Sequence, residues 1–387
     1  MTTRTLRIRR VARFTPAAWD ASFSGLVVAV AVLAVATGTR ADHTASAAVY
    51  VRSDTDHTQV ISPRWKLRTA LPDEQTHVDV AYSVDVWTSA SVDIVASASK
   101  PVTEQRDELN LGVDRVFGDL TLRSNYRYST EPDYVSHAGS VSIAWDLANK
   151  AVTLAWSATG SADHVGRAGD PNFAESVSTL STGLSLTHVV DRNTVIQALY
   201  DLSAVRGYQS SAYRYVAFGS DGPCAAAASF CRPEHDPRER LRHALALRVR
   251  RALSTEWSVG GGYRAYVDDW GIVSHTAKAD LAWAPLPRST LALSYRYYTQ
   301  NAADHYKAQY SASDVGLNYY TRDKELSPLS SQRVALEFDW VWELAHDGSG
   351  LLTAIAVGST FYRYRDFSML TQTTALEVTA VTGMEFQ

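Results

Sequence analysis

Apolar and polar residues alternate along most of this chain, and the alternation is clearest from Leu241 to Tyr298. In the first part of that stretch, aliphatic residues occupy one parity and arginines the other: Leu245, Leu247 and Val249 against Arg242, Arg248 and Arg250. Successive side chains of a β-strand point to opposite faces, so each such strand has one apolar and one charged face. The pattern therefore predicts an all-β protein.

The same alternation predicts sixteen strands between about Ala47 and Phe386. Connections alternate between short and long, and the longest are expected near residues 205–238 and 301–331. Tryptophans such as Trp283 fall beside short turns, whereas tyrosines such as Tyr126 fall beside the opposite rim. These features are typical of a single antiparallel transmembrane β-barrel, with its apolar face toward lipid and its polar face toward water. The alternative is a water-soluble exported β-protein that buries its apolar faces as a core.

The N-terminus resembles a cleavable export signal. Several arginines precede the apolar run Gly25–Ala36, which is shorter than the ~20 residues that a membrane-spanning helix needs. Thr39 and Ala41 fit the small residues of a cleavage site. We therefore expect residues 1–41 to be a signal peptide and residues 42–387 to form an outer-membrane barrel reached through the periplasm, since only helices and closed barrels satisfy the backbone in lipid.

If the charged faces point inward, the interior contains residues of both signs. The expected pore-lining residues are Arg64, Lys66, Arg68, Asp79, Asp85, Glu108, Asp114, Arg123, Arg127, Arg242, Arg248, Arg250, Arg264, Arg296, Glu337, Asp339 and Glu343. These charges could form a field across the lumen, or they could pair across strands and keep the wall wetted and rigid. Barrels of roughly 16 strands enclose water when nothing fills them, so the first functional hypothesis is a porin-like channel for small polar solutes. The pattern specifies neither the solute nor the ion selectivity.

Two cysteines, Cys224 and Cys231, lie close together in the first long connection. An exported chain passes through an oxidising compartment, so we expect a disulfide between them. A metal site is less favoured, because no nearby His or Cys completes a ligand set. The surrounding loop could fold inward as a constriction or cover the mouth.

Two other functional classes remain open. A lipid-acting hydrolase could use His275 or His137 at the outer rim, although the adjacent Ser274 and Ser136 point to the opposite face of their strands. A non-conducting scaffold could bind a partner through the long loops. We assign no catalytic residue, metal or cofactor, and the acidic clusters Asp268–Asp269 and Glu234–Asp236 lack the spacing of a calcium loop.

The expected partners are outer-membrane lipid, small polar solutes and the outer-membrane assembly machinery. The last strand ends with Phe386 and Gln387, and it resembles the C-terminal signal that this machinery recognises, although a terminal aromatic is displaced by one residue. The net charge of −4 gives no field for nucleic acid. The oligomeric state is not specified.

Several phrases resemble a bacterial outer-membrane family, the domain of unknown function numbered 3570. They are Val60-Ile-Ser-Pro, Trp87-Thr-Ser-Ala-Ser-Val-Asp, Tyr134-Val-Ser-His, Asp268-Asp-Trp-Gly-Ile-Val-Ser-His-Thr and Tyr298-Thr-Gln. The likeness is expected to extend over the mature chain. It implies a β-barrel in a Gram-negative envelope, but it carries no known activity and no functional residue.

Overall fold

The computed structural model describes residues 43–89, 102–220, 224, 230–344, 350–367 and 369–386. The expected signal peptide and its cleavage site lie outside these residues. No helix among the residues described is long and apolar enough to cross a membrane.

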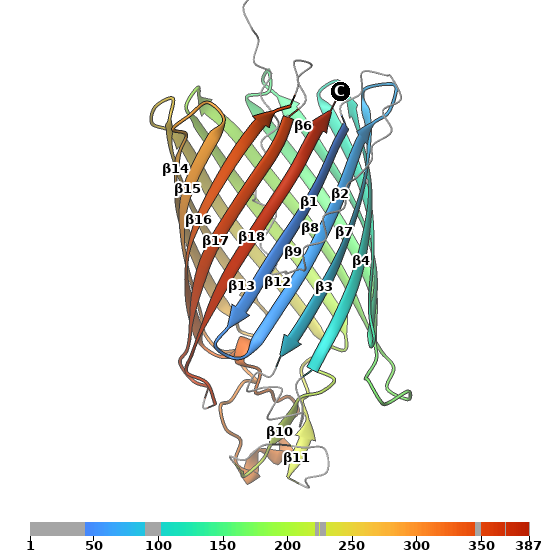
Figure 1. Ribbon diagram of the computed structural model, residues 1–387. Coiled ribbons are helices and arrows are strands. Elements are labelled where there is room, and N and C mark those ends of the chain that lie inside the picture. Colours follow the sequence, from blue (N-terminus) through green and yellow to red (C-terminus); the bar gives the residue numbers. More distant parts are fainter. Residues whose placement is uncertain are drawn as a thin grey trace, which may run out of the picture.

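Sixteen strands of the described chain close into one antiparallel barrel (Figure 1). They are β1 (His43–Asp54), β2 (Thr58–Ala70), β3 (Thr76–Ser89), β4 (Val102–Phe117), β5 (Leu120–Glu131), β6 (Tyr134–Leu147), β7 (Val152–Val165), β8 (Glu175–Asp191), β9 (Thr194–Gly207), β12 (Glu239–Ala252), β13 (Trp257–Asp268), β14 (Val273–Trp283), β15 (Ser289–Gln300), β16 (Leu329–Glu343), β17 (Gly350–Tyr364) and β18 (Gln372–Phe386). Each strand pairs with its neighbours in the chain, and β1 closes the ring against β18, with His43 opposite Phe386. Closure leaves no strand edge unpaired in the lipid.

Large apolar side chains cover the outer face of this barrel. Leu336, Phe338 and Trp342 of β16 are 48%, 42% and 50% exposed, whereas the inward-facing Asp79 and Asp114 are buried. A water-soluble protein would reverse this distribution, because exposing so much apolar surface to water is unfavourable. The outer face therefore requires lipid, and the barrel is a transmembrane one. The predicted transmembrane barrel is confirmed, and the alternative of a water-soluble protein with an apolar core is wrong.

The two longest connections lie at the same rim, as predicted, although that rim also carries short turns such as the one between β5 and β6. The turn-side rim holds both ends of the barrel sheet, at His43 and Phe386, and the loop-side rim holds the connection 301–328 and the described parts of the connection 208–238 (Figure 1). On the outer face at the turn side, Trp257 stacks on Trp283 with ring centroids 5.5 Å apart. Such aromatic belts are typical of the membrane interface.

Two details differ from the sequence prediction. Strand β9 continues to Gly207 and β16 begins at Leu329, so each long connection is three residues shorter at one boundary than expected. The first connection also contains a hairpin, β10 (Tyr215–Ala217) with β11 (Cys231–Pro233), that was not predicted. Strands of three residues are too short to produce a recognisable alternation. The second connection contains the 3₁₀ helices η2 (Ala312–Gly316) and η3 (Lys324–Leu326).

Candidate functional site

All of the charged residues predicted to line the interior lie on the inner face of the barrel. Residues that pair directly across strands share a face, and the registers connect all of them around the sheet. The structure thus places Arg64, Lys66, Arg68, Asp79, Asp85, Glu108, Asp114, Arg123, Arg127, Arg242, Arg248, Arg250, Arg264, Arg296, Glu337, Asp339 and Glu343 on one continuous surface. That they line a conducting pore stays a prediction.

On the β2–β5 wall, these charges are paired. Arg68 Nη1 lies 2.6 Å from Asp114 Oδ1, and Arg123 Nη2 lies 2.7 Å from Asp79 Oδ1. Lys66 Nζ adds a longer contact of 3.8 Å to Asp79. Both carboxylates are buried among these cations, so this wall is held by an ion-pair network rather than by isolated charges.

Sequence reasoning missed some of the ion-paired residues of the inner face. Arg106 of β4 pairs with Asp85, its Nε 2.8 Å from Oδ2, and Glu377 of β18 pairs with Arg333, its Oε2 2.8 Å from Nε. The alternation carries the signal for both, because Arg106 and Glu377 fall on the polar parity of their strands. The alternation predicts the face on which a charged residue lies, but it does not predict which residue of a neighbouring strand is its ion-pair partner.

A glycine lies between the partners of several ion pairs. Gly260 of β13 separates Arg250 of β12 from Asp280 of β14, whose Nη2 and Oδ2 atoms are 2.6 Å apart. A Cβ atom at Gly260 would lie 2.5 Å from the Asp280 carboxylate, so only glycine leaves room for the pair to meet across the middle strand. The arrangement recurs with Gly112 between Asp79 and Arg123 and with Gly358 between Arg333 and Glu377.

The opposite wall brings like charges together. Lys278 of β14 lies directly opposite Arg296 of β15, which in turn lies directly opposite Arg333 of β16. Together with Arg264 of β13 we call these residues the basic row. Like charges directly opposite one another are destabilising, and Glu377 beside Arg333 and Glu337 near Lys278 oppose this repulsion. Toward the turn side, the acidic residues Asp280, Glu337 and Asp339 follow on the same strands.

Inward-facing basic side chains of β12, β13 and β14 reach solvent. Arg248, Arg264 and Lys278 are exposed although they project from the inner face, well inside their strands. The inner face of β6–β9, by contrast, is dominated by small hydroxyl residues such as Ser142, Ser157 and Ser185. The interior therefore has strongly charged walls and one weakly polar wall.

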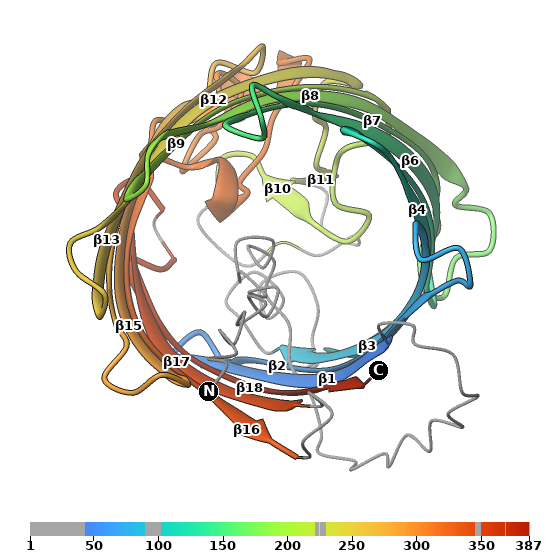
Figure 2. The same cartoon turned by 90° about the horizontal axis from the view of Figure 1, so that it is seen from above.

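The two long connections pack on each other over the loop-side mouth. We call their described residues, 208–220, 230–238 and 301–328, the loop cap. Phe218 bridges to Tyr310 and His235 to Tyr320, and Val216, Phe218, Tyr310 and Tyr320 form a small apolar cluster. Figure 1 places β10 and β11 beyond the rim, and Figure 2 places them across part of the barrel opening. The described part of the first connection thus covers the mouth and does not follow the inner wall.

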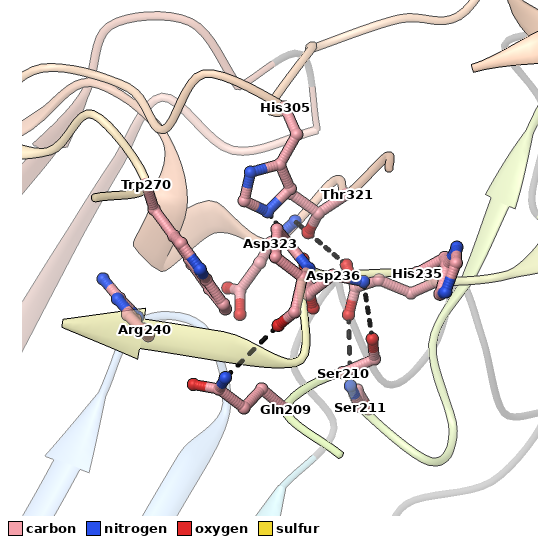
Figure 3. A network of polar contacts seen from close by, with 12 residues as sticks. Gln209, Ser210, Ser211, His235, Asp236, Arg240, Trp270, His305, Thr321 and Asp323 are labelled. Carbon is pink, nitrogen blue, oxygen red and sulfur yellow. Dashed lines mark hydrogen bonds and ion pairs between the residues drawn. The ribbon is translucent and has the colours of Figure 1, made fainter. Parts of the chain in front are cut away.

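Buried acidic side chains hold the loop cap together (Figure 3). Glu234 Oε2 lies 2.9 Å from Arg214 Nη1, and its other oxygen accepts a hydrogen bond from the Thr321 hydroxyl. Asp236 Oδ1 lies 2.8 Å from His305 Nε2. Burial, with the nearby Asp236 and Asp323 carboxylates, raises the pKa of Glu234 to about 7, against the opposing effect of Arg214. The acidic cluster Glu234–Asp236 is therefore engaged by protein partners.

Contacts on several sides of the rim anchor the loop cap. Lys324 Nζ lies 2.7 Å from Asp56 Oδ2 in the β1–β2 turn. The Tyr213 hydroxyl donates to Asp133 between β5 and β6, and it accepts from the Ala168 amide between β7 and β8 at 2.7 Å. The cap therefore spans the mouth and is not attached only where its own chain leaves the barrel.

The structure joins Cys224 to Cys231 by a disulfide, with Cα atoms 5.7 Å apart. The bridge closes a segment of sequence separation 7 next to β11. It therefore restrains the part of the first connection that forms the β10–β11 hairpin.

The Ser-His pairs considered for catalysis are separated by the sheet. Ser136 faces inward and donates to Asp163 Oδ1 at 2.6 Å, whereas His137 faces outward with its Nδ1 2.7 Å from the Tyr126 hydroxyl. At the second pair, Ser274 is buried on the inner face and the outward His275 Nδ1 lies 2.6 Å from the Tyr263 hydroxyl. Each histidine is thus held by a tyrosine of the outer belt.

The second acidic cluster is likewise engaged by protein groups. Asp268 accepts from Arg240 Nε at 2.9 Å, and Asp269 accepts from the Leu241 amide at 2.9 Å. Among the described residues, one acidic group has carboxylate oxygens within 4.8 Å of one another, at Glu104, Glu131 and Asp133. It lies at the loop-side ends of β4 and β5 and could hold a cation.

Comparison with known sequences decides the family. The sequence profile of the protein family of unknown function DUF3570 matches residues 92–350. The chain belongs to the DUF3570 family. The match begins after β3 and ends at the start of β17, so it is narrower than the expected likeness over the whole mature chain. None of the curated proteins matches this DUF3570 chain.

One solved structure shares the barrel architecture of this DUF3570 protein, and two further structures are similar to it at lower scores. A bacterial polysaccharide outer membrane secretin has a TM-score of 0.50 at 8% identity and covers 90% of this chain and 98% of its own. OprD of Pseudomonas aeruginosa has a TM-score of 0.45 at 9% identity, with 90% and 96% covered. The ferric enterobactin receptor PfeA of the same organism has a TM-score of 0.44 at 11% identity over 84% of this chain. The DUF3570 chain spans only 54% of that receptor, and at such identities the likeness concerns the fold alone.

Proposed function

We propose that this chain is a porin-like channel that passes small polar solutes across the outer membrane. The observation that carries the proposal is the exposure of Arg248, Arg264 and Lys278 on the inner face of a barrel whose outer face is apolar. Unscreened charges in a dry interior would be very costly, so this wall needs water. A barrel of roughly 16 strands has the circumference for an aqueous channel.

The outer-membrane location is supported by the apolar outer face, the aromatic belt at the turn side, the outer tyrosines and the position of the two longest loops at one rim. On this reading the chain is exported through the periplasm behind its signal peptide. The assembly machinery would then engage β18, the C-terminal strand.

The basic row gives the channel a preference for anions. Four cations from adjacent strands project into the lumen at neighbouring positions, and their mutual repulsion falls when an anion lies among them. The ion-paired β2–β5 wall adds little net charge. The loop cap, anchored on several sides of the mouth, would limit the size of the solutes that reach this row.

Conductance in planar bilayers tests the channel. We expect the full chain, shown to be folded by its shifted mobility on an unheated gel, to give steady ohmic steps. A second protein, in which a short turn replaces residues 209–237, should give larger steps, because Gly207 and Arg238 already lie together with a 2.8 Å backbone hydrogen bond. If both folded proteins insert without conducting, the barrel is a scaffold or an enzyme and the proposal is wrong.

A further inference from the structure

A groove of about 440 Å³ opens on the outer, lipid-facing surface at the loop-side ends of β6–β9. Its lining includes Val135, His137, Ala162, His164, Ser178 and Arg206. The groove exists because small side chains here replace the leucines and aromatics that cover the rest of the outer face. Its volume lies in the range of pockets that hold small molecules.

The small-residue surface continues from the groove toward the middle of the membrane. His137 lies opposite Ala162, and the next outward-facing pair along the same strands is Gly139 opposite Gly160. A Cβ atom at either glycine would meet nothing within 4 Å. A shallow trough therefore leads from the groove into the apolar belt.

The rim end of the groove carries cationic and hydrogen-bonding groups. Arg206 is exposed, and its Nε is 3.6 Å from Glu239 in a contact that both largely solvent-exposed side chains can give up. The Tyr126 hydroxyl holds Nδ1 of His137, so Nε2 is the nitrogen left for another partner. Asp163 also lines the groove, but its carboxylate accepts from Ser136 Oγ at 2.6 Å and from Ser161 Oγ at 3.4 Å on the inner side.

We propose that this groove binds a lipid that carries a phosphate headgroup. The phosphate would contact Arg206 and His137 at the rim, and an acyl chain would lie along the trough at Gly139 and Gly160. The occupant must be an amphiphile, because the polar end of the site faces the headgroup level and its apolar end faces the hydrocarbon. Arginine suits this role because its guanidinium matches phosphate geometry. The proposal rests on the membrane location and not on conduction.

Native mass spectrometry of the full chain in detergent tests the site. The probes are dimyristoyl phosphatidate, dimyristoyl phosphatidylcholine and inorganic phosphate. We expect phosphatidate to bind at least about tenfold more tightly than phosphatidylcholine, and Arg206→Gln to remove most of that difference, since one charge-assisted hydrogen bond is worth about this factor. Ala162→Leu fills the groove without changing its charge and should weaken both lipids. Arg363→Gln is the control, because Arg363 is an exposed, outward-facing arginine at the same rim on β17.

The outcomes are distinct. The proposal fails if Arg206→Gln and Arg363→Gln have equal effects, if Ala162→Leu leaves lipid binding intact, or if inorganic phosphate at the same concentration displaces phosphatidate. It also fails if a second copy of the chain, and not lipid, occupies the surface. Conductance of the same variants should be unchanged, so loss of this site would leave the channel proposal standing.

Discussion

Replacing Lys278 by glutamine removes one positive charge from the basic row while keeping a long polar side chain. Lys278 is exposed on the inner face and lies directly opposite Arg296, with Arg333 on the next strand. If the row sets a preference for anions, the substitution should lower that preference without closing the channel. The sign follows from charge alone, because every neighbour in the row is also a cation.

The size of the effect follows from the spacing of the strands. Adjacent strands are about 4.8 Å apart, so an ion in front of Arg296 lies roughly 6 Å from the charge of Lys278. At that distance the Coulomb energy in water is about 0.7 kcal/mol, and screening in ~0.1 M salt reduces it to about 0.4 kcal/mol. This energy has opposite signs for anions and cations, so the free-energy difference between an anion and a cation at the row changes by about 0.8 kcal/mol. We therefore expect the anion-to-cation permeability ratio to fall roughly threefold to fourfold.

The assay is the reversal potential of single channels under a salt gradient. Lys150→Gln is the matched control, because it removes the same charge from the β6–β7 turn, outside the lumen. Raising the salt concentration should reduce the difference between Lys278→Gln and the unaltered chain, because the field is screened. Equal permeability ratios for Lys278→Gln and Lys150→Gln would show that the basic row does not act on passing ions.

Two further predictions concern the membrane face and the loop cap. Leu336→Arg places a charge in hydrocarbon, so it should lower the free energy of unfolding, measured by urea titration from lipid vesicles, by about 2–4 kcal/mol. Ser142→Arg on the inner face should lower it far less. Equal losses for the two variants would contradict the assignment of faces. The pKa of Glu234 is raised in the folded protein, so the closed loop cap binds the carboxyl proton of Glu234 more tightly than an opened loop does. The stability of the closed cap therefore falls as pH rises from about 4.5 to about 7. Hydrogen exchange of residues 230–238, corrected for intrinsic rates, should therefore increase over that window, and Glu234→Gln should abolish the increase.

Alternation predicts the barrel because lipid and water impose opposite demands on the two faces of every strand. Strand β9 obeys the same register, although it places the apolar Val195 and Leu199 on the inner face. A few apolar residues are tolerated there, since neighbouring strands supply the polar groups that wet the wall. The faces of the predicted pore-lining residues follow from this parity alone.

The loop cap has no such periodicity. Its contacts join residues far apart in the chain, such as Lys324 with Asp56 and Arg214 with Asp323, and they depend on where the closed barrel brings the loops together. The basic row likewise depends on register between strands, which is set by the turns between them. The sequence places cations on β14, β15 and β16, but only the pairing of the strands brings them to one level.

Gly260 offers the sharpest test of how the charged wall is built. Gly260→Ala adds a Cβ atom that would lie 2.5 Å from the Asp280 carboxylate, so the carboxylate must move away from Arg250. We expect a loss of about 1–3 kcal/mol in unfolding from lipid vesicles, as for other overpacked sites. Gly261→Ala is the control, because its Cβ would meet only ordinary contacts, with Val249 Cγ1 at 3.8 Å, and it should be neutral or slightly stabilising.

A double-mutant cycle identifies the cause of that loss. In an Asp280→Ala background the carboxylate is absent, so Gly260→Ala should cost almost nothing and the coupling between the two positions should equal most of the original penalty. If Gly260→Ala remains costly there, or if Gly261→Ala is equally damaging, the glycine serves backbone geometry and does not make room for the ion pair. A large coupling would extend the same explanation to Gly112 and Gly358, because each also lies between the partners of an ion pair that crosses a strand.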